Sequence, residues 1–351
     1  MKTMKRLVFL VLCLIVAAGM VFAGGGKQAG GAAAGGDSGK LKIYFIPKDS
    51  VNPYFYAIDV GFKEAIKELG ENRFEYIYTG PATAGPTDQI EYIEAAVQNK
   101  AFAIFVSANH DSALNRTFDD ARAAGVKVFI MNQDIPGSES HRDAAIMPAS
   151  FANVGPLLME LMGKQLNYQG DFAILSATTD APDQNTWIAG IKKELAENSK
   201  YANMKLIDVV YGDDQPEKST TEMEALLTKY PNIKGVIAPT AAGIPACAKV
   251  LQTRRLTGQV KLTGLGLPST MKEFVDDGTC ESFALWNPPY EGYLATYLVD
   301  GISKGYNPAP GSSFQAGKLG TVTIESNGQI LTLKDLMVYD KSNIAEYAPL
   351  F

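Results

Sequence analysis

The 351-residue sequence contains few of the side chains on which metal and redox chemistry depend. Its three Cys and two His residues are widely spaced and too few for a disulfide framework or a zinc cage. It also lacks a block of basic residues, since 32 Lys and Arg against 38 Asp and Glu give a formal net charge of −6. An excess of negative charge argues against nucleic acid or an anionic membrane surface as the main partner. We therefore expect no metal and no nucleic-acid partner.

Common catalytic motifs are missing as well. The sequence has no Gly-x-Ser-x-Gly elbow, phosphate loop, dinucleotide fingerprint or His-Glu-x-x-His motif. We expect no catalytic residue, no cofactor and no enzymatic activity. Acid–base chemistry by Lys48 with Asp183 is the enzymatic alternative. Cys247 and Cys280 are expected to be buried thiols, with a disulfide between them as the alternative.

What is present is the composition of an ordinary globular protein. Hydrophobic residues make up 46% of the chain and charged residues 20%, which excludes a disordered or collagen-like protein. At roughly 100–200 residues per domain, the length predicts two domains.

The N-terminus has the order of a secretory signal peptide. Lys2, Lys5 and Arg6 precede an apolar run at 7–22 that is shorter than the roughly 20 residues a spanning helix needs. We predict a cleaved signal peptide at residues 1–23, with a retained membrane anchor as the alternative. Cys13 lies within the run, so we expect no lipid anchor. Residues 24–40 are Gly-rich and are expected to form a disordered linker.

From Leu41 onward, short β-branched runs alternate with longer amphipathic runs, which is typical of βαβ units and parallel sheets. The first half and the second half each contain four such runs at similar spacing. We therefore predict an α/β fold with two Rossmann-like, doubly wound lobes. The expected strands are Leu41–Ile46, Phe74–Tyr78, Phe102–Val106, Val126–Met131, Asp171–Leu175, Lys205–Tyr211, Gly235–Ala238 and Lys261–Gly264.

The loops at the carboxyl ends of these strands predict the ligand site, because doubly wound sheets bind ligands at that edge. These loops contain compact polar groups, at 47–49, 107–110, 132–134, 176–185, 239–241 and 266–268. We expect all of them to face a cleft between the two lobes.

The residue types in these loops favour a small polyhydroxylated ligand. Lys48 offers three donors, Asp183 accepts at two oxygens, and Asn132 both donates and accepts. Tyr54 and Phe55 follow in the first loop, and an aromatic ring suits the apolar face of a sugar. One of these two rings is expected to belong to the core, and Asp183 could instead be a helix N-cap.

Several segments resemble the type I periplasmic substrate-binding proteins of sugar ABC transporters, over residues 43–347. The similarity is closest to the rhamnose-binding proteins and the autoinducer-2-binding LsrB-like proteins. The segments that carry it are Ile46-Pro47-Lys48, Tyr78-Thr79-Gly80-Pro81, Asp183-Gln184-Asn185-Thr186-Trp187, Ile237-Ala238-Pro239-Thr240, and residues 209–219, 263–279, 283–288 and 314–320.

The resemblance implies two lobes joined by a three-strand hinge, with crossings near 147–150, 285–287 and 319–321. Lobe 1 would then comprise residues 41–148 plus 287–319, and lobe 2 residues 149–286 plus 320–351. It also implies a periplasmic or extracytoplasmic monomer that delivers a monosaccharide to a membrane ABC permease. A chemoreceptor is a possible second partner, and a sensor that signals in its closed form is an alternative function.

The LsrB pattern maps its ligand-binding residues onto Lys48, Asp183 and Gln184 and onto the backbone of Pro239 and Ala241. Asn132 replaces the first aspartate of that pattern, which argues against autoinducer-2. Gly266 stands where ribose and galactose binders have Asp. A deoxyhexose such as rhamnose is therefore the first expected ligand and autoinducer-2 the second. The predicted ligand-binding residues are Lys48, Asn52, Tyr54, Phe55, Ser107, Asn132, Asp134, Asp183, Gln184, Trp187, Pro239, Ala241, Gly266, Trp286 and Asn287.

Overall fold

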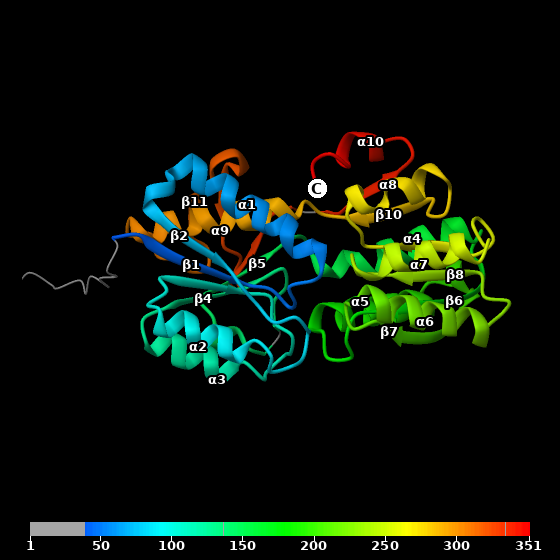
Figure 1. Cartoon of the computed structure of the whole chain (residues 1–351), viewed down its shortest axis with the longest axis horizontal. Helices are drawn as coiled ribbons and strands as arrows, with labels where there is room; N and C mark the ends of the chain where they lie inside the picture. The colour runs from blue at the N-terminus through cyan, green and yellow to red at the C-terminus, as the bar shows by residue number, and fades with distance from the viewer. Residues whose placement is uncertain (1–38, 136, 334) are drawn as a thin grey trace, which may run out of the picture. The chain divides into compact units, whose positions relative to one another are not determined.

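Short strands alternate with longer helices along the chain (Figure 1). The computed structural model describes residues 39–135, 137–333 and 335–351. The elements up to the first crossing between sheets are β1 (Leu41–Ile46), α1 (Pro53–Leu69), β2 (Phe74–Tyr78), α2 (Ile90–Gln98), β3 (Ala103–Val106), α3 (Asn115–Ala123), β4 (Lys127–Met131) and β5 (Ala144–Met147). Those that follow are α4 (Val154–Gln165), β6 (Gln169–Ser176), α5 (Pro182–Glu197), β7 (Asn203–Tyr211), α6 (Pro216–Lys229), β8 (Gly235–Ala238), α7 (Gly243–Thr253), β9 (Lys261–Gly264), α8 (Pro268–Asp276) and β10 (Ser282–Leu285). The C-terminal elements are α9 (Pro288–Ser303), β11 (Ser313–Gln315), β12 (Thr321–Thr323), β13 (Gln329–Leu331), β14 (Met337–Asp340) and α10 (Ile344–Tyr347).

The strands form two separate parallel sheets, which confirms the predicted α/β class. The first sheet has the order β13-β5-β4-β3-β1-β2, and the second has the order β7-β6-β8-β9. We call the first sheet with the helices packed on it the first lobe, and the second sheet with its helices the second lobe. β10 pairs antiparallel with β14 beside the second sheet, and β11 pairs with β12. Each predicted strand is present, with ends within two residues of the prediction.

Each face of the first sheet packs against its own pair of helices, because successive side chains of a strand point to opposite faces. On one face, Ile43 and Phe45 of β1 join a core that includes residues of α1 and α9. On the other face, Tyr44 and Ile46 pack with residues of α2 and α3. In the second lobe α4 packs against α5, and α6 packs against α7.

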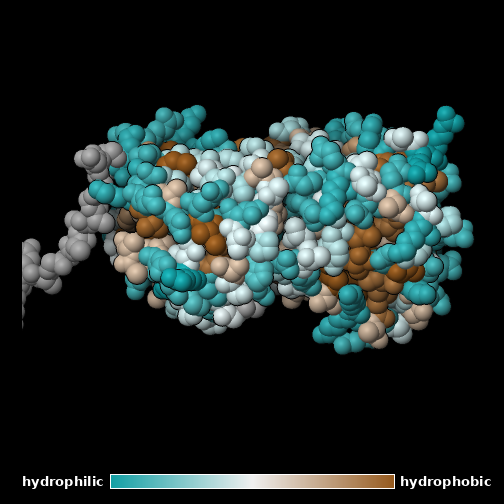
Figure 2. Space-filling model, turned by 60° about the horizontal axis from the view of Figure 1, so that its bottom comes forward, coloured by the Kyte–Doolittle hydropathy of each residue, from teal (hydrophilic) through white to brown (hydrophobic). Residues whose placement is uncertain are grey.

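The edge strand β7 is more exposed to solvent than the central strand β8 of the same sheet. Its apolar residues Leu206, Ile207, Val209 and Val210 are half-buried, whereas the central strand β8 is buried along its whole length. Figure 2 shows apolar side chains gathered on the face of the second lobe that carries β7.

Helices α1 and α9 lie side by side in the first lobe (Figure 1). A Cβ atom added at Gly61 would lie 1.8 Å from the carbonyl oxygen of Pro289, and one at Gly292 would lie 2.2 Å from that of Ile58. Only glycine allows two helix backbones to approach so closely. This contact orients the N-terminus of α1, where several of the predicted site residues lie.

The chain crosses between the lobes three times, between β5 and α4, between β10 and α9, and between β13 and β14. The first and third crossings are hydrogen-bonded, since the Thr332 amide donates to Met147 O at 2.9 Å and the Leu333 amide donates to Pro148 O at 3.2 Å. The third crossing was expected at 319–321, and this was wrong because β13 still pairs with β5 of the first sheet. Residues 329–331 therefore belong to the first lobe rather than to the predicted lobe 2, and the other predicted lobe boundaries stay a prediction.

The predicted signal peptide (1–23) lies outside the described residues, as does nearly all of the predicted linker (24–40). All described residues belong to one compact unit. Within this part of the chain, no helix combines the length and the apolar character needed to cross a bilayer. Cys247 and Cys280 are buried free thiols, so the disulfide alternative is excluded.

Candidate ligand-binding site

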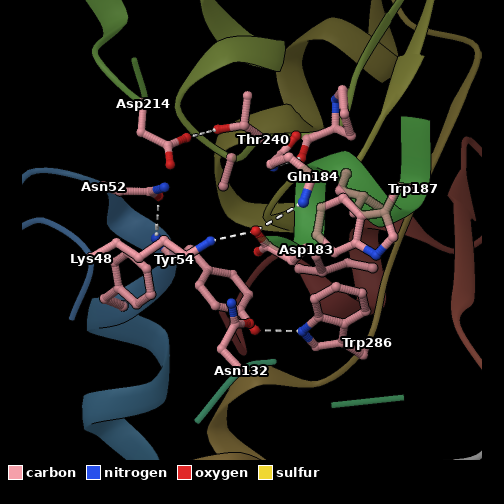
Figure 3. Close-up of a pocket in the computed structure, with 15 residues that line it drawn as sticks. Lys48, Asn52, Tyr54, Asn132, Asp183, Gln184, Trp187, Asp214, Thr240 and Trp286 are labelled. Carbon is pink, nitrogen blue, oxygen red and sulfur yellow. Dashed lines mark hydrogen bonds and ion pairs between the residues drawn. The ribbon is translucent and has the colours of Figure 1, made fainter. Parts of the chain in front are cut away.

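A cavity lies at the carboxyl ends of strands from both sheets (Figure 3). About 390 Å³ of space lies between the protein atoms here, part of it open to solvent. Its lining comes from the segments that follow β1, β4, β6, β7, β8 and β9 and from the end of β10. The lining residues are Lys48, Asn52, Tyr54, Phe55, Asn132, Asp183, Gln184, Trp187, Asp214, Pro239, Thr240, Ala241, Leu265, Leu285 and Trp286.

Most of the predicted site residues line this cavity. They are Lys48, Asn52, Tyr54, Phe55, Asn132, Asp183, Gln184, Trp187, Pro239, Ala241 and Trp286. Topology brings them together, because the strands that precede them end at the same edges of the two sheets. Whether each of them contacts a ligand stays a prediction.

Asp134 and Ser107 do not line the cavity. Asp134 forms a buried ion pair with Arg142, with nitrogen–oxygen distances of 2.7 and 2.6 Å, and accepts a hydrogen bond from Gln329 at 2.8 Å. Its carboxylate therefore connects the loop after β4 with β13. Ser107 is buried, and its carbonyl accepts a hydrogen bond from Gln89 at 2.8 Å.

Gly266 and Asn287 are also outside the cavity lining. A Cβ atom at Gly266 would lie 2.9 Å from side-chain atoms of both Ile244 and Met271, so glycine is needed there for packing. Asn287 precedes Pro288 at the start of α9, and its Oδ1 atom is buried without a hydrogen-bond partner in residues 39–135, 137–333 and 335–351.

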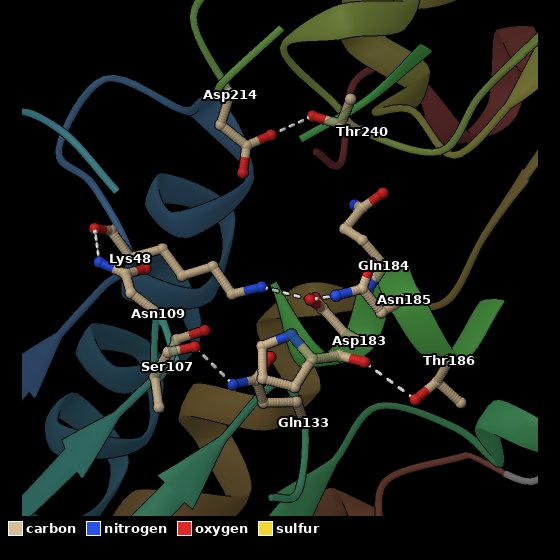
Figure 4. Close-up of polar contacts among 12 residues, drawn as sticks. Lys48, Ser107, Asn109, Gln133, Asp183, Gln184, Asn185, Thr186, Asp214 and Thr240 are labelled. Carbon is tan, nitrogen blue, oxygen red and sulfur yellow. Dashed lines mark hydrogen bonds and ion pairs between the residues drawn. The ribbon is translucent and has the colours of Figure 1, made fainter. Parts of the chain in front are cut away.

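An ion pair between Lys48 and Asp183 connects the two lobes across the cavity (Figure 4). Lys48 Nζ donates to Asp183 Oδ1 at 2.5 Å, and both side chains are at least 96% buried. Lys48 follows β1, whereas Asp183 lies in the first turn of α5, where the helix dipole favours a negative charge. Asp183 is not the helix N-cap, since Ala181 occupies that position.

Gln184 holds the second-lobe wall of the cavity in place. Its Nε2 atom donates to Pro239 O at 2.7 Å, and its Oε1 atom accepts from Ser176 Oγ at 3.0 Å. Because the side-chain amide connects β6, α5 and the loop after β8, it fixes the backbone of Pro239 at the cavity surface.

Asn132 presents a buried polar atom that has no hydrogen-bond partner among the residues that the structure describes. Its side chain is 4% exposed, and Oδ1 accepts no hydrogen bond. The residue has a φ of 68°, a left-handed conformation that Asn adopts more readily than most residues. A buried acceptor without a donor is costly, so a ligand hydroxyl at this position would be stabilising.

The rings of Tyr54, Trp187 and Trp286 line the site, and Phe151 packs against the two tryptophans without lining it. Trp286 lies 6.2 Å from Tyr54, 5.9 Å from Trp187 and 6.0 Å from Phe151, measured between ring centroids. Tyr54 belongs to α1, Trp187 to α5, and the other two rings lie at the first and second crossings. Phe55 packs against Phe45 of the core as well as lining the cavity, so both predicted rings reach the site.

The hydroxyl group of Tyr54 is fixed by two neighbours. Trp286 Nε1 donates to it at 2.5 Å, and the hydroxyl donates to Glu291 Oε1 at 2.5 Å. Glu291 is fully buried, and burial raises the pKa of its carboxyl group to about 8. The sequence interpretation did not identify Glu291, because nothing in the local pattern places it behind the cavity.

Two more buried carboxyl groups lie near Lys48. Burial, with the neighbouring Asp214 carboxylate as a smaller cause, raises the pKa of Asp49 to about 7. Burial also raises the pKa of Asp214 above its ordinary value, while Lys48 acts in the opposite direction.

Asp214, Leu265 and Leu285 line the cavity but were missed in the sequence, and Thr240 belongs to the predicted loop 239–241 but was not among the predicted ligand-binding residues. Asp214 lies in the polar tract Gly212-Asp213-Asp214-Gln215, which resembles a solvent-exposed turn. A usable signal was available, because this tract follows β7 just as the predicted loops follow the other strands.

Residues 43–307 match the family described as the periplasmic binding protein domain. This chain is a member of that family. The resemblance stated from the sequence is thereby confirmed, and the family places such proteins outside the cytoplasm.

Two solved structures of the family cover almost the whole chain. A solute-binding protein of an ABC transporter from Clostridium phytofermentas, with bound L-rhamnose, is 34% identical, with 89% of this chain and 99% of that chain covered and a TM-score of 0.82. LsrB from Clostridium saccharobutylicum, in complex with AI-2, is 23% identical, with 88% and 99% covered and a TM-score of 0.81. At 23% identity, the similarity to LsrB shows a shared fold and nothing more.

A curated relative is the xylose/arabinose-binding protein XylF of Sulfolobus acidocaldarius. It is 26% identical over 74% of this chain, and the match spans 65% of the relative's own length, which is less than two thirds. The L-rhamnose-bound protein and XylF are substrate-binding proteins and not enzymes. This agrees with the expectation drawn from the missing catalytic motifs.

Proposed function

We propose that this periplasmic binding protein captures one small sugar in the cavity between its lobes and passes it to a membrane ABC permease. The observation that carries the proposal is the Lys48–Asp183 ion pair, which joins the two lobes beside a wall of aromatic rings. Polar groups from both lobes with flat apolar surfaces beside them suit a sugar ring, which has hydroxyl groups at its edge and an apolar face.

The remaining hydrogen-bonding capacity of the site supports a polyhydroxylated ligand. Asn132 has a buried acceptor to which no described residue donates, and Asp183 and Lys48 can exchange part of their mutual contact for ligand hydroxyls. A hydrogen bond to a charged group contributes about 1.5–3 kcal/mol. Two or three such bonds with a packed ring are consistent with micromolar affinity.

L-rhamnose is the proposed ligand. The relative from Clostridium phytofermentas was solved with this sugar bound and shares 34% of aligned residues with this chain. Autoinducer-2 is the second candidate because Lys48, Asp183 and Gln184 match the LsrB pattern, although Asn132 replaces one of its aspartates.

Closure follows from ligand contacts on both lobes. A sugar held by Lys48 and Asn132 of the first lobe gains further contacts from Asp183 and Gln184 only when the lobes meet, so it favours the closed form. A permease would then receive the closed, loaded monomer. A receptor domain that binds the closed form would instead make the protein a sensor, and a pull-down with each partner would distinguish the two.

A thermal-shift screen of the purified chain tests the proposal. The panel comprises L-rhamnose, L-fucose, D-ribose, D-galactose and autoinducer-2. A ligand at 100 times its Kd stabilises the folded state by about 2.7 kcal/mol and raises the unfolding temperature. We expect the largest rise with L-rhamnose. The absence of any rise across the panel would contradict the sugar-binding proposal, and recovery of a chemically altered sugar would support an enzyme instead.

A further inference from the structure

The turn after β7 directs a buried carboxylate into the cavity. Asp213 and Asp214 both have left-handed backbone conformations, with φ values of 53° and 55°. This turn separates the two side chains: Asp214 is 4% exposed and lines the cavity, whereas the Asp213 side chain is 45% exposed and pairs with Lys218. Two identical neighbouring residues therefore have different environments.

Only one of the two carboxylate oxygens of Asp214 is hydrogen-bonded within the described part of the protein. Thr240 donates its hydroxyl proton to Oδ1 of Asp214. The Thr240 oxygen accepts from the Ala242 amide at 3.3 Å, which fixes the direction of this bond. In Figure 4, the second oxygen of Asp214 points toward the space beside Lys48 and Asp183.

The charge of the cavity wall is unbalanced. Among its lining residues, one cationic side chain, Lys48, faces two carboxylates, Asp183 and Asp214. Lys48 is already paired with Asp183, and Asp49 contributes a further carboxyl group close to Asp214. A ligand with a carboxylate or a phosphate would therefore meet like charges in a water-poor site, whereas hydroxyl groups would find acceptors.

We propose that Asp214 determines the ligand specificity of this site. Its free oxygen accepts a hydrogen bond from a hydroxyl of a neutral sugar, and its charge excludes acidic sugars and sugar phosphates. The inference rests on the proposed sugar-binding function and adds to it the chemical class that is admitted. Thr240 orients the carboxylate from the neighbouring loop.

Calorimetric titration of the purified chain with L-rhamnose, and with the panel sugar that gives the largest thermal shift, tests the inference. Asp214→Asn keeps the shape of the side chain and tolerates the left-handed turn, but removes the charge. We expect it to weaken binding of the neutral sugar by about tenfold or more. Asp213→Asn is the matched control, with the same change in the same backbone conformation, and is expected to leave affinity within about twofold because that side chain faces solvent.

A second measurement uses acidic ligands. D-galacturonate and L-rhamnose 1-phosphate are expected not to bind the wild-type chain, and the selectivity for the neutral sugar should decrease in Asp214→Asn. Asp214→Ser, with folding checked by circular dichroism, gives an independent variant. Unchanged sugar affinity in both Asp214 variants, or wild-type binding of an acidic sugar as tight as that of the neutral one, would overturn the inference. Such results leave sugar binding itself intact, whereas a wild-type chain that binds no sugar contradicts the proposed function as well.

Discussion

Buried acidic side chains are the individual residues whose environment differs most from water in this protein. Glu291 is fully buried behind the cavity; one carboxyl oxygen accepts a hydrogen bond from Tyr54 at 2.5 Å, and the other has no hydrogen-bond partner within the described part of the chain. Because burial disfavours the charged form, the pKa of Glu291 rises from an ordinary value of 4.5 to about 8. The folded protein therefore holds this proton at neutral pH, whereas the unfolded chain releases it.

This difference predicts how stability depends on pH. The contribution of Glu291 is fully present below about pH 4.5 and is lost as the pH rises through about 8. In Glu291→Gln, which stays neutral and keeps the acceptor for Tyr54, we expect the free energy of unfolding to fall less steeply between pH 5 and pH 8. The slope should change by about 1.4 kcal/mol per pH unit. Urea unfolding at several pH values measures this slope. Equal slopes in the wild type and in Glu291→Gln would show that Glu291 is ionised in the folded protein.

At the scale of secondary-structure elements, the contact between α1 and α9 positions the first-lobe side of the site. The two backbones meet at Gly61 and Gly292. The N-terminus of α1 has a local determinant as well, since the Asn52 side chain accepts a hydrogen bond from the Tyr54 amide at 3.0 Å. The position of Tyr54 thus depends on two features. The helix cap at Asn52 can be recognised in the sequence, whereas the contact between α1 and α9 cannot.

Two glycine-to-alanine substitutions in α9 should differ in their effect on the stability of the fold. Gly292→Ala would place a Cβ atom 2.2 Å from Ile58 O and push the helices apart, so we expect destabilisation by about 3 kcal/mol or more. Gly301→Ala meets only Tyr306, at 3.6 Å, and should be neutral or stabilising by up to about 1 kcal/mol because alanine favours helix. Thermal unfolding compares them. Equal stability of the two variants would mean that α1 and α9 are free to move apart.

At the scale of the whole molecule, the Lys48–Asp183 ion pair connects the lobes. Removal of one partner of a buried pair leaves an uncompensated charge, at a cost of about 3–5 kcal/mol. In a two-lobed protein, opening the lobes would rehydrate that charge. The pair therefore couples the chemistry of the cavity to the separation of the lobes.

We expect Lys48→Met to favour separated lobes and to weaken sugar binding at least tenfold. Small-angle X-ray scattering should show a larger radius of gyration than in the wild type at the same concentration. Lys63→Met is the matched control, because Lys63 is 66% exposed and its pair with Asp59 lies within α1. An unchanged radius in Lys48→Met, or the same increase in Lys63→Met, would refute the coupling between this ion pair and closure.

The sequence predicted the parts of the fold and of the site that local pattern controls. Alternating apolar runs located every strand of the two sheets except β5 and β13, and the residues after them included Lys48, Asn132 and Asp183. Sequence order could not show that β13 returns to the first sheet, because a three-residue strand has too little pattern to select its partner.

Tertiary structure decided which polar residues face the cavity. Asp134 and Asp214 both follow strands in polar loops, yet Asp134 is neutralised by Arg142 and bonded to Gln329, whereas Asp214 is turned into the site. The partner of Asp134 on β13 is 195 positions away, so no local signal could reveal it. The positions of the strands follow from the alternation of apolar and amphipathic runs along the sequence. The direction and charge of a buried side chain depend instead on distant segments that folding brings next to it.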